Sequence, residues 1–288
     1  MATDRLTAPI LVLENDVSGP VAELGRWLRE AGAELDIRSG ALGEAIPADL
    51  DGYSGLIVMG GAMGAQDDDR APWLPDVRAL LSQAVRAELP TLGVCLGAQL
   101  LAVATGGRVD RAELPEYGTQ LVAKRQAAAT DPLLRELPIT PDVLQWHVDE
   151  VSQLPGNAVL LASSPGTEVQ AFRVGRLAWG FQFHIETTPE IVAAWAREDA
   201  EALADYDVDR ILARSAAAHA DIAEVWRPVA ETLVGIAADP VAAAGPRTLP
   251  MAGSRTAPTS TAGPITDPAA IRAALAAELQ AAREPHRH

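Results

Sequence analysis

The first hundred residues alternate between short apolar runs and stretches with the apolar spacing of a helix, and this alternation limits the possible folds more than any other feature. Each run has the length of a buried strand. Repeated strand–helix–strand units indicate an α/β fold, in which helices cover both faces of a mainly parallel sheet. The predicted strands are 10–13, 33–37, 55–59 and 91–94, and the predicted helices are 21–31, 72–87 and 98–105.

The chain changes character after residue 107, where turns rather than helices separate the strands. Gly175 predicts a hairpin turn, and Thr187 to Glu190 has the pattern of a capping box with proline near the first helical position. We therefore expect antiparallel strands added to the sheet, followed by a C-terminal helical extension. The predicted strands are 119–123, 143–146, 158–162, 169–172 and 177–185, and the predicted helices run from 187 to about 203 and over 208–234.

Composition divides the chain into one large domain and a tail. Residues 1–236 are expected to form the domain, with a core at about 9–200. Residues 237–267 are rich in Ala, Pro and Thr and can bury little surface, so they predict a flexible linker. Residues 268–288 predict a short C-terminal helix or tail.

The net charge of −16 argues against sequence-independent binding to nucleic acid, which needs a basic surface, and against docking to anionic lipid. No stretch reaches 18 apolar residues, so no membrane-spanning helix is expected. The start of the sequence lacks the pattern of a signal peptide, which makes a cytoplasmic protein the expectation. With one cysteine, the chain can form neither an intrachain disulfide nor a thiolate metal cluster, and we expect no metal and no cofactor.

That cysteine, Cys95, lies where a predicted strand meets a predicted helix. Gly93 and Gly97 flank it at the two positions where side chains would collide in a sharp turn, which is the pattern of a nucleophile elbow with cysteine in place of serine. The unpaired N–H groups and the positive dipole end of the helix favour a thiolate there. Cys95 is therefore the candidate nucleophile, and a buried core cysteine is the alternative.

A cysteine nucleophile needs a base and a group that orients the base. Side chains alternate along a strand, so His184 and Glu186 are expected on one face, with Phe181, Phe183 and Ile185 on the other. Glu186 could then orient His184, as the acid of a triad does. The other histidines are His147, a rival base that we rank second, His219 in a surface helix, and His286 and His288 in the tail.

The pattern Gly93-x-Cys95-x-Gly97-x-Gln99, followed by Phe183-His184-x-Glu186, resembles the class I (triad-type) glutamine amidotransferases, among them the glutaminase domain of GMP synthetase. The resemblance covers roughly residues 9–200 and implies a flavodoxin-like fold. The family usually has proline between the histidine and the glutamate, where this chain has Ile185. Alternation is unaffected, so we expect little catalytic consequence.

The resemblance also implies roles for the site residues. Cys95 would attack the side-chain amide of glutamine, His184 would move protons, and Glu186 would hold His184. Further implied residues are Gly61 and the N–H of Leu96 as oxyanion-hole donors, and Gly60, Gln99, Gln145 and His147 as substrate-binding residues. The alternatives are an ordinary turn for Gly60 and Gly61, a helix cap or core hydrogen bond for Gln99, and a structural role for His147. The acidic run 67–69, which follows the glycine loop, would face an incoming substrate or partner, and a solvated loop is the alternative.

Three functions remain open. The first is a glutaminase-type amidotransferase that acts on L-glutamine, free-standing or paired with a separate synthetase subunit, because the chain has no phosphate-binding Gly-x-x-x-x-Gly-Lys-Ser/Thr loop. The second is a γ-glutamyl hydrolase or peptidase that acts on γ-glutamyl compounds with the same triad. The third is a non-catalytic binding or regulatory protein, against which Cys95, His184 and Glu186 count. Related cysteine-elbow proteases usually have histidine directly after the cysteine, where this chain has Leu96.

Overall fold

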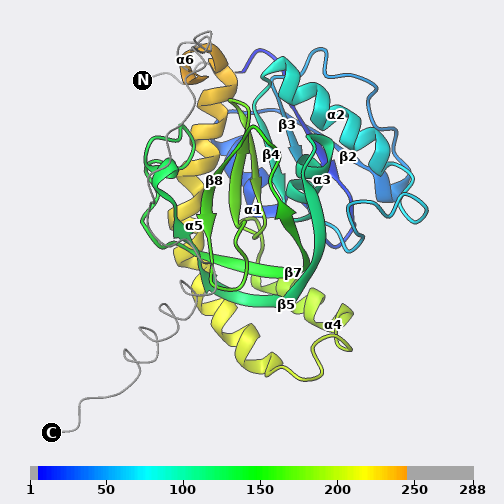
Figure 1. Ribbon diagram of the computed structural model, residues 1–288, viewed down its shortest axis with the longest axis vertical. Coiled ribbons are helices and arrows are strands. Elements are labelled where there is room, and N and C mark those ends of the chain that lie inside the picture. The colour runs from blue at the N-terminus through cyan, green and yellow to red at the C-terminus, as the bar shows by residue number, and fades with distance from the viewer. Residues whose placement is uncertain (1–5, 245–288) are drawn as a thin grey trace, which may run out of the picture. The chain divides into compact units, whose positions relative to one another are not determined.

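An eight-stranded sheet forms the centre of the structure, a computed structural model that describes residues 6–244 (Figure 1). Its strand order is β2-β1-β3-β4-β10-β9-β8-β6. Strands β2 to β10 of this order are parallel, and β9, β8 and β6 extend the sheet in antiparallel fashion. The strands are β1 (Ile10–Glu14), β2 (Leu35–Ser39), β3 (Gly55–Val58), β4 (Thr91–Val94), β6 (Ala123–Lys124), β8 (Ala158–Ser163), β9 (Ala171–Val174) and β10 (Ala178–Phe181).

Helices cover both faces of the sheet, as the strand–helix alternation predicts. Successive side chains of a strand point to opposite faces, and in β1 Ile10 and Val12 pack with one pair of helices while Leu11 and Leu13 pack with the other pair. The helices are α1 (Ala22–Glu30) and α5 (Val208–Ala238) on the first face, and α2 (Leu74–Ala87) and α3 (Leu96–Ala104) on the second.

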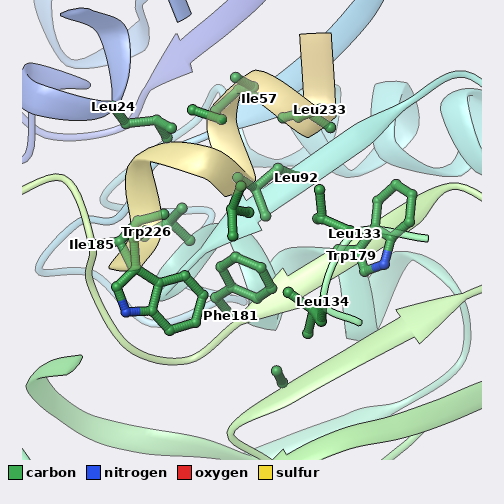
Figure 2. Close-up of a cluster of buried hydrophobic side chains, with 14 of the residues drawn as sticks. Leu24, Ile57, Leu92, Leu133, Leu134, Trp179, Phe181, Ile185, Trp226 and Leu233 are labelled. Atoms are coloured by element: carbon green, nitrogen blue, oxygen red, sulfur yellow. The ribbon is translucent and has the colours of Figure 1, made fainter. Parts of the chain in front are cut away.

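Helix α5 closes the core on the first face. Figure 2 shows Trp226 and Leu233 of this helix directed toward Phe181, Leu92 and Ile57 of the sheet. The Trp226 indole is buried, and its Nε1 donates a hydrogen bond to the backbone oxygen of Asp142 at 2.9 Å. Burial of an aromatic side chain stabilises a fold by about 1.5–3 kcal/mol, so this face of the sheet depends on the helix that follows the last strand.

Two long strands, β5 (Arg108–Leu121) and β7 (Asp142–Gln153), form a separate antiparallel ribbon. Helix α4 (Pro189–Glu198) packs on it through a cluster that contains Leu144, Trp146 and Trp195. Figure 1 shows β5 and β7 between the ends of the main strands and α4. The ribbon contacts the residues after β10 through an isolated bridge, in which Leu144 and His184 exchange two backbone hydrogen bonds.

The structure departs from the expectations at three places after residue 107. Strand β10 ends at Phe181 instead of continuing to residue 185, because His184 pairs with the ribbon instead of with a strand of the main sheet. The strands expected at 119–123 and 143–146 are parts of the longer ribbon strands. Helix α4 ends at Glu198, and Leu203 joins its apolar cluster from a turn that follows the helix.

The C-terminal helical extension is present. Helix α5 runs to Ala238 and a short helix α6 covers Pro240–Ala244, so the described part of the expected linker 237–267 is largely helical. The rest of that segment and the expected tail 268–288 lie outside the described residues. Short 3-10 helices cover Gly40–Leu42 and Gln126–Ala129. Within residues 6–244, no helix is both long enough and apolar enough to cross a membrane.

Candidate active site

Cys95 lies at the sharp turn between β4 and α3, with φ 51° and ψ −110°. A non-glycine residue at positive φ is strained by about 1–3 kcal/mol. The turn leaves no room beside the cysteine, since a Cβ atom at Gly93 would lie 2.4 Å from the backbone oxygen of Gly97, and one at Gly97 would lie 2.0 Å from that of Val58. Both flanking glycines are therefore required by the turn itself.

Replacing Gly97 by alanine is expected to destabilise the protein by about 3 kcal/mol, because its Cβ would overlap backbone that cannot rotate away. Gly235 in α5 is the matched control, since a Cβ there would meet no atom within 4 Å. Gly235→Ala should stabilise the protein by about 0.5–1 kcal/mol. Urea unfolding of both variants measures the difference, and equal midpoints would contradict a turn closed by steric contact.

His184 and Glu186 form a buried pair. The Nδ1 atom of His184 lies 2.7 Å from Oε1 of Glu186, and the other carboxylate oxygen accepts a hydrogen bond from the backbone N–H of Ile185 at 2.9 Å. Phe183 and Ile185 point into the hydrophobic core. The alternation inferred from the sequence therefore holds, although the regular strand ends before these residues. Because Nδ1 faces the carboxylate, Nε2 is the nitrogen left for another group.

The sheet brings His184 to Cys95. Strands β4 and β10 are parallel neighbours, and the backbone N–H of Cys95 donates to the oxygen of Phe181 at 2.7 Å. A Cβ atom at Gly60 would lie 3.2 Å from Cε1 of His184 and 3.5 Å from Cβ of Cys95. Burial alone would lower the pKa of His184, but the charges of Glu186 and Cys95, and the hydrogen bonds that His184 makes with both, raise it to about 10. His184 therefore holds a proton at neutral pH.

Cys95 and His184 open into a pocket of about 480 Å³. Its walls combine the glycine loop after β3, the start of α3, the ribbon strand β7 and helix α4. The volume lies within the range of small-molecule sites. Four charged Arg, Asp and Glu side chains line the pocket. Arg111 and Asp149 form an ion pair at 3.6 Å, and Glu198 and Asp199 are the other two.

Gly60 and Gly61 both line this pocket beside Cys95. Leu96 is the first residue of α3, so its backbone N–H has no partner within the helix. The glycine loop and the start of α3, which contain the expected oxyanion donors Gly61 and Leu96, thus lie beside each other next to Cys95.

Gln99 also lines the pocket, and its amide is already engaged. Its Nε2 donates to the backbone oxygen of Asp149 at 3.0 Å and to Oε1 of Gln182 at 3.3 Å. Gln182 Nε2 in turn lies 3.8 Å from Sγ of Cys95. The core hydrogen bond considered as the alternative for Gln99 is therefore present, and it links α3 to the ribbon.

The two residues chosen from β7 differ in their surroundings. Gln145 does not line the pocket and is fully buried, and its side-chain amide has no hydrogen-bond partner among the described residues. His147 does line the pocket, but its ring nitrogens lie 3.0 Å from the backbone oxygen of Asp149 and 3.1 Å from Glu116. His147 therefore has no free nitrogen with which to act as a base.

Sequence reasoning did not select the aromatic wall of the pocket. Trp195 of α4 packs against the His184 ring at 4.8 Å between ring centroids, and Trp146 contacts both Trp195 and Tyr117. The Trp195 Nε1 donates to the backbone oxygen of Ser18, and that of Trp146 donates to Asp199. No sequence pattern singled them out, because their closeness to His184 depends on the ribbon.

Three other candidates have local partners. His219 is half-buried and contacts Thr187 and the backbone oxygen of Ser215, so it is not a plain surface residue. Asp67 binds the backbone N–H of Gly64, and Asp68 pairs with Arg78. The acidic run does not line the pocket. In the part of the chain that the structure describes, no three His, Cys, Asp or Glu side chains gather as metal ligands would.

Known proteins match this chain at both the sequence and the structure level. The family model of the class I glutamine amidotransferases matches residues 20–194. The glutamine amidotransferase-like protein YfeJ of Salmonella typhimurium is 30% identical over 191 residues, which cover 65% of this chain and 79% of that protein. A crystal structure of a glutamine amidotransferase from Thermotoga maritima superposes with a TM-score of 0.71 at 28% identity, covering 79% of this chain and 98% of the other.

Two GMP synthase sequences are also similar. The glutamine-hydrolysing GMP synthase of Aeropyrum pernix is 34% identical over 188 residues, which cover 62% of this chain but only 33% of that protein. A glutamine-hydrolysing GMP synthase subunit of Thermoplasma volcanium is 34% identical over 169 residues, which cover 56% of this chain and 75% of that protein. The chain thus corresponds to most of one synthase subunit, and to about a third of the longer synthase.

Proposed function

This chain belongs to the class I glutamine amidotransferase family, and we propose that it hydrolyses the side-chain amide of L-glutamine through a γ-glutamyl thioester on Cys95. The observation on which the proposal rests is the geometry of one turn. Cys95 is held at positive φ at the start of α3, beside a histidine whose Nδ1 is bound by Glu186. A nucleophile and a base in one pocket, with a buried carboxylate that orients the base, are the set of groups that acyl transfer requires.

In the first half of the reaction, His184 has taken the thiol proton, and the Cys95 sulfur attacks the amide carbon of glutamine. The carbonyl oxygen becomes an oxyanion, toward which the N–H groups of Gly61 and Leu96 donate. Each such donor contributes about 2.7–4 kcal/mol to transition-state stability. The protonated His184 then gives its proton to the departing nitrogen, and the C–N bond breaks. Ammonia leaves, and the γ-glutamyl group remains on Cys95 as a thioester.

In the second half, a water molecule replaces ammonia beside His184. His184 takes a proton from the water, the oxygen adds to the thioester carbon, and the C–S bond breaks to release glutamate and the Cys95 thiolate. The same imidazole therefore serves as an acid and then as a base. Glu186 stabilises the imidazolium and fixes the tautomer that leaves Nε2 toward the cysteine.

The ammonia is proposed to pass to a separate synthetase subunit, or to be released by a free-standing enzyme. Similarity to the Thermoplasma volcanium protein supports the first possibility, because that relative is by name one subunit of a GMP synthase. The described residues form one α/β domain and its helical extension.

A second candidate is the hydrolysis of γ-glutamyl conjugates by the same triad. The pocket volume favours it, since about 480 Å³ exceeds the space that one amino acid fills. An aromatic wall of Trp146, Trp195 and Tyr117 could accept the group attached to the γ-amide nitrogen.

Release of ammonia and glutamate from L-glutamine by the wild-type protein is the test of the proposal. Release of glutamate from γ-glutamyl peptides is measured alongside. Faster turnover of glutamine supports the amidotransferase, whereas a preference for the peptides supports the conjugate hydrolase. If neither is hydrolysed and Cys95 does not react with a diazoketone analogue of glutamine, the protein is a non-catalytic binding protein and the proposal is wrong.

A further inference from the structure

A second histidine–glutamate pair lies at the pocket wall. His147 of β7 and Glu116 of β5 face each other across the ribbon, with 3.1 Å between Nε2 and Oε2, and both side chains are buried. The other ring nitrogen, Nδ1, lies 3.0 Å from the backbone oxygen of Asp149. The His184 pair leaves one ring nitrogen for Cys95, whereas both nitrogens of His147 already have acceptors.

The carboxylate of Glu116 accepts hydrogen bonds from several side chains besides His147. Its Oε2 also accepts a hydrogen bond from Gln170 at 2.8 Å, and its Oε1 accepts one from Ser164 at 3.3 Å. Burial alone would raise the pKa of Glu116, but the hydrogen bond and charge of His147 outweigh burial, so that its pKa lies below the ordinary value. Both ring nitrogens of His147 therefore face oxygen acceptors, one of which is this carboxylate.

The pair is connected to the nucleophile by hydrogen bonds. The Asp149 oxygen that accepts from His147 also accepts from Gln99, which binds Gln182, and the Gln182 amide lies 3.8 Å from the Cys95 sulfur. Hydrogen bonds from His147 and from Gln99 therefore both fix the position of the backbone of residues 146–149 relative to Cys95. At its near end, the Trp146 oxygen lies 3.9 Å from that sulfur.

Residues 146–149 all line the pocket, so that their backbone can contact a ligand. Strand pairing passes from Glu116↔His147 directly to Arg111↔Asp149, so Val148 has no partner on β5, and it lines the pocket. A substrate with an ammonium and a carboxylate can form hydrogen bonds with backbone N–H and C=O groups at a pocket wall.

We infer that Glu116 is a positioning residue, which acts through His147 to hold the 146–149 backbone at the distance from Cys95 that the amino-acid end of the substrate requires. This inference rests on the proposed function. It assigns His147 to the support of the pocket wall instead of direct contact with substrate through its ring.

Two substitutions of Glu116 separate the effect of side-chain length from the effect of charge. Glu116→Asp keeps the carboxylate but shortens the side chain by one methylene, so that it no longer reaches His147. Glu116→Gln keeps the side-chain length and loses the charge. The amide of the new glutamine can still donate a hydrogen bond to Nε2 of His147, and Gln170, with its own amide turned over, can accept a hydrogen bond from the new glutamine. The control is Glu113→Gln, which removes an exposed carboxylate from the same strand.

The measurement is the rate at which Cys95 is modified by two reagents. Diazo-oxo-norleucine, the diazoketone analogue of L-glutamine, carries the amino-acid end, and iodoacetamide does not. In Glu116→Asp we expect diazoketone labelling to slow by about 10- to 100-fold, the cost of misplacing a reacting group, with iodoacetamide within about twofold of wild type. Glu116→Gln and Glu113→Gln should label within about threefold of wild type with both reagents.

Three results for the variants would overturn the inference. They are unchanged diazoketone labelling of Glu116→Asp, equal slowing of both reagents in that variant, and slower diazoketone labelling of Glu116→Gln than of Glu116→Asp. A failure of the proposed function is seen in the wild type itself, which would react with iodoacetamide but not with the diazoketone. That outcome would overturn the inference as well.

Discussion

Glutamine turnover is expected to fall by about 10⁵- to 10⁶-fold when Cys95 is replaced by alanine, the loss typical of removing a nucleophile from a triad. The remaining groups could still bind the substrate and polarise its carbonyl, but no thioester could form. Ammonia release, measured at saturating glutamine, gives the ratio of the two turnover rates. Trapping of the radiolabelled acyl group in acid-quenched wild-type protein, and its absence from the variant, ties the loss to the covalent step.

The strain at Cys95 provides the control for this substitution. Glycine accepts φ 51° without cost, whereas alanine keeps the strain. Cys95→Gly should therefore be as inactive as Cys95→Ala but more stable by about 1–2 kcal/mol in urea unfolding. If the alanine variant retained one per cent of wild-type turnover, Cys95 would not be the nucleophile.

Replacing Glu186 by glutamine should lower kcat by about 10³- to 10⁴-fold, as loss of the orienting carboxylate does in other triads. Both carboxylate oxygens are acceptors, one facing Nδ1 of His184 and the other facing the backbone N–H of Ile185. A glutamine has only one oxygen for two donors. Its amide nitrogen must oppose the Ile185 N–H, or donate to Nδ1 and force the tautomer that places a proton on Nε2.

The pH dependence follows from the same pair. The pKa of His184 is raised from 6.5 to about 10, and the protonated ring is the acid that ammonia needs in order to leave. We expect turnover to hold through neutral and mildly alkaline pH and to fall as the pH rises through about 10. In Glu186→Gln the loss of the neighbouring charge lowers the pKa of His184, so the fall moves to lower pH.

Nitrogen NMR of labelled histidine side chains reads this titration directly, and Glu190→Gln, which removes an exposed carboxylate from α4, is the control. The control should leave the His184 signal unchanged. A titration of His184 at the same pH in wild type and Glu186→Gln would contradict the role of the carboxylate.

The sequence predicted those features that depend on neighbours along the chain. Strand–helix alternation predicted the parallel sheet, because each element shows its own apolar period. Gly93 and Gly97 predicted the sharp turn at Cys95, and the structure confirms that side chains at either position would meet backbone. Alternation around His184 predicted its pairing with Glu186, since two residues on one face of an extended segment are close wherever that segment lies.

What the sequence did not predict depends on pairing between distant strands. Glu116 was not selected, because it meets His147 only through the irregular register of the ribbon, where the pairing skips from Arg111 to Glu116 on β5. The end of β10 at Phe181 has the same origin, since His184 leaves the sheet to pair with Leu144. Gln145 was assigned to the pocket by the family resemblance, but its side chain is buried and does not line the pocket.

The position of β10 in the sheet also governs when the protein can become active during its synthesis. This strand is the last to leave the ribosome, yet it lies between β4 and β9, and the histidine follows it directly. A nascent or truncated chain that ends before it can have the cysteine at its turn but no base beside it. Under the proposed mechanism, such unfinished copies would release no ammonia.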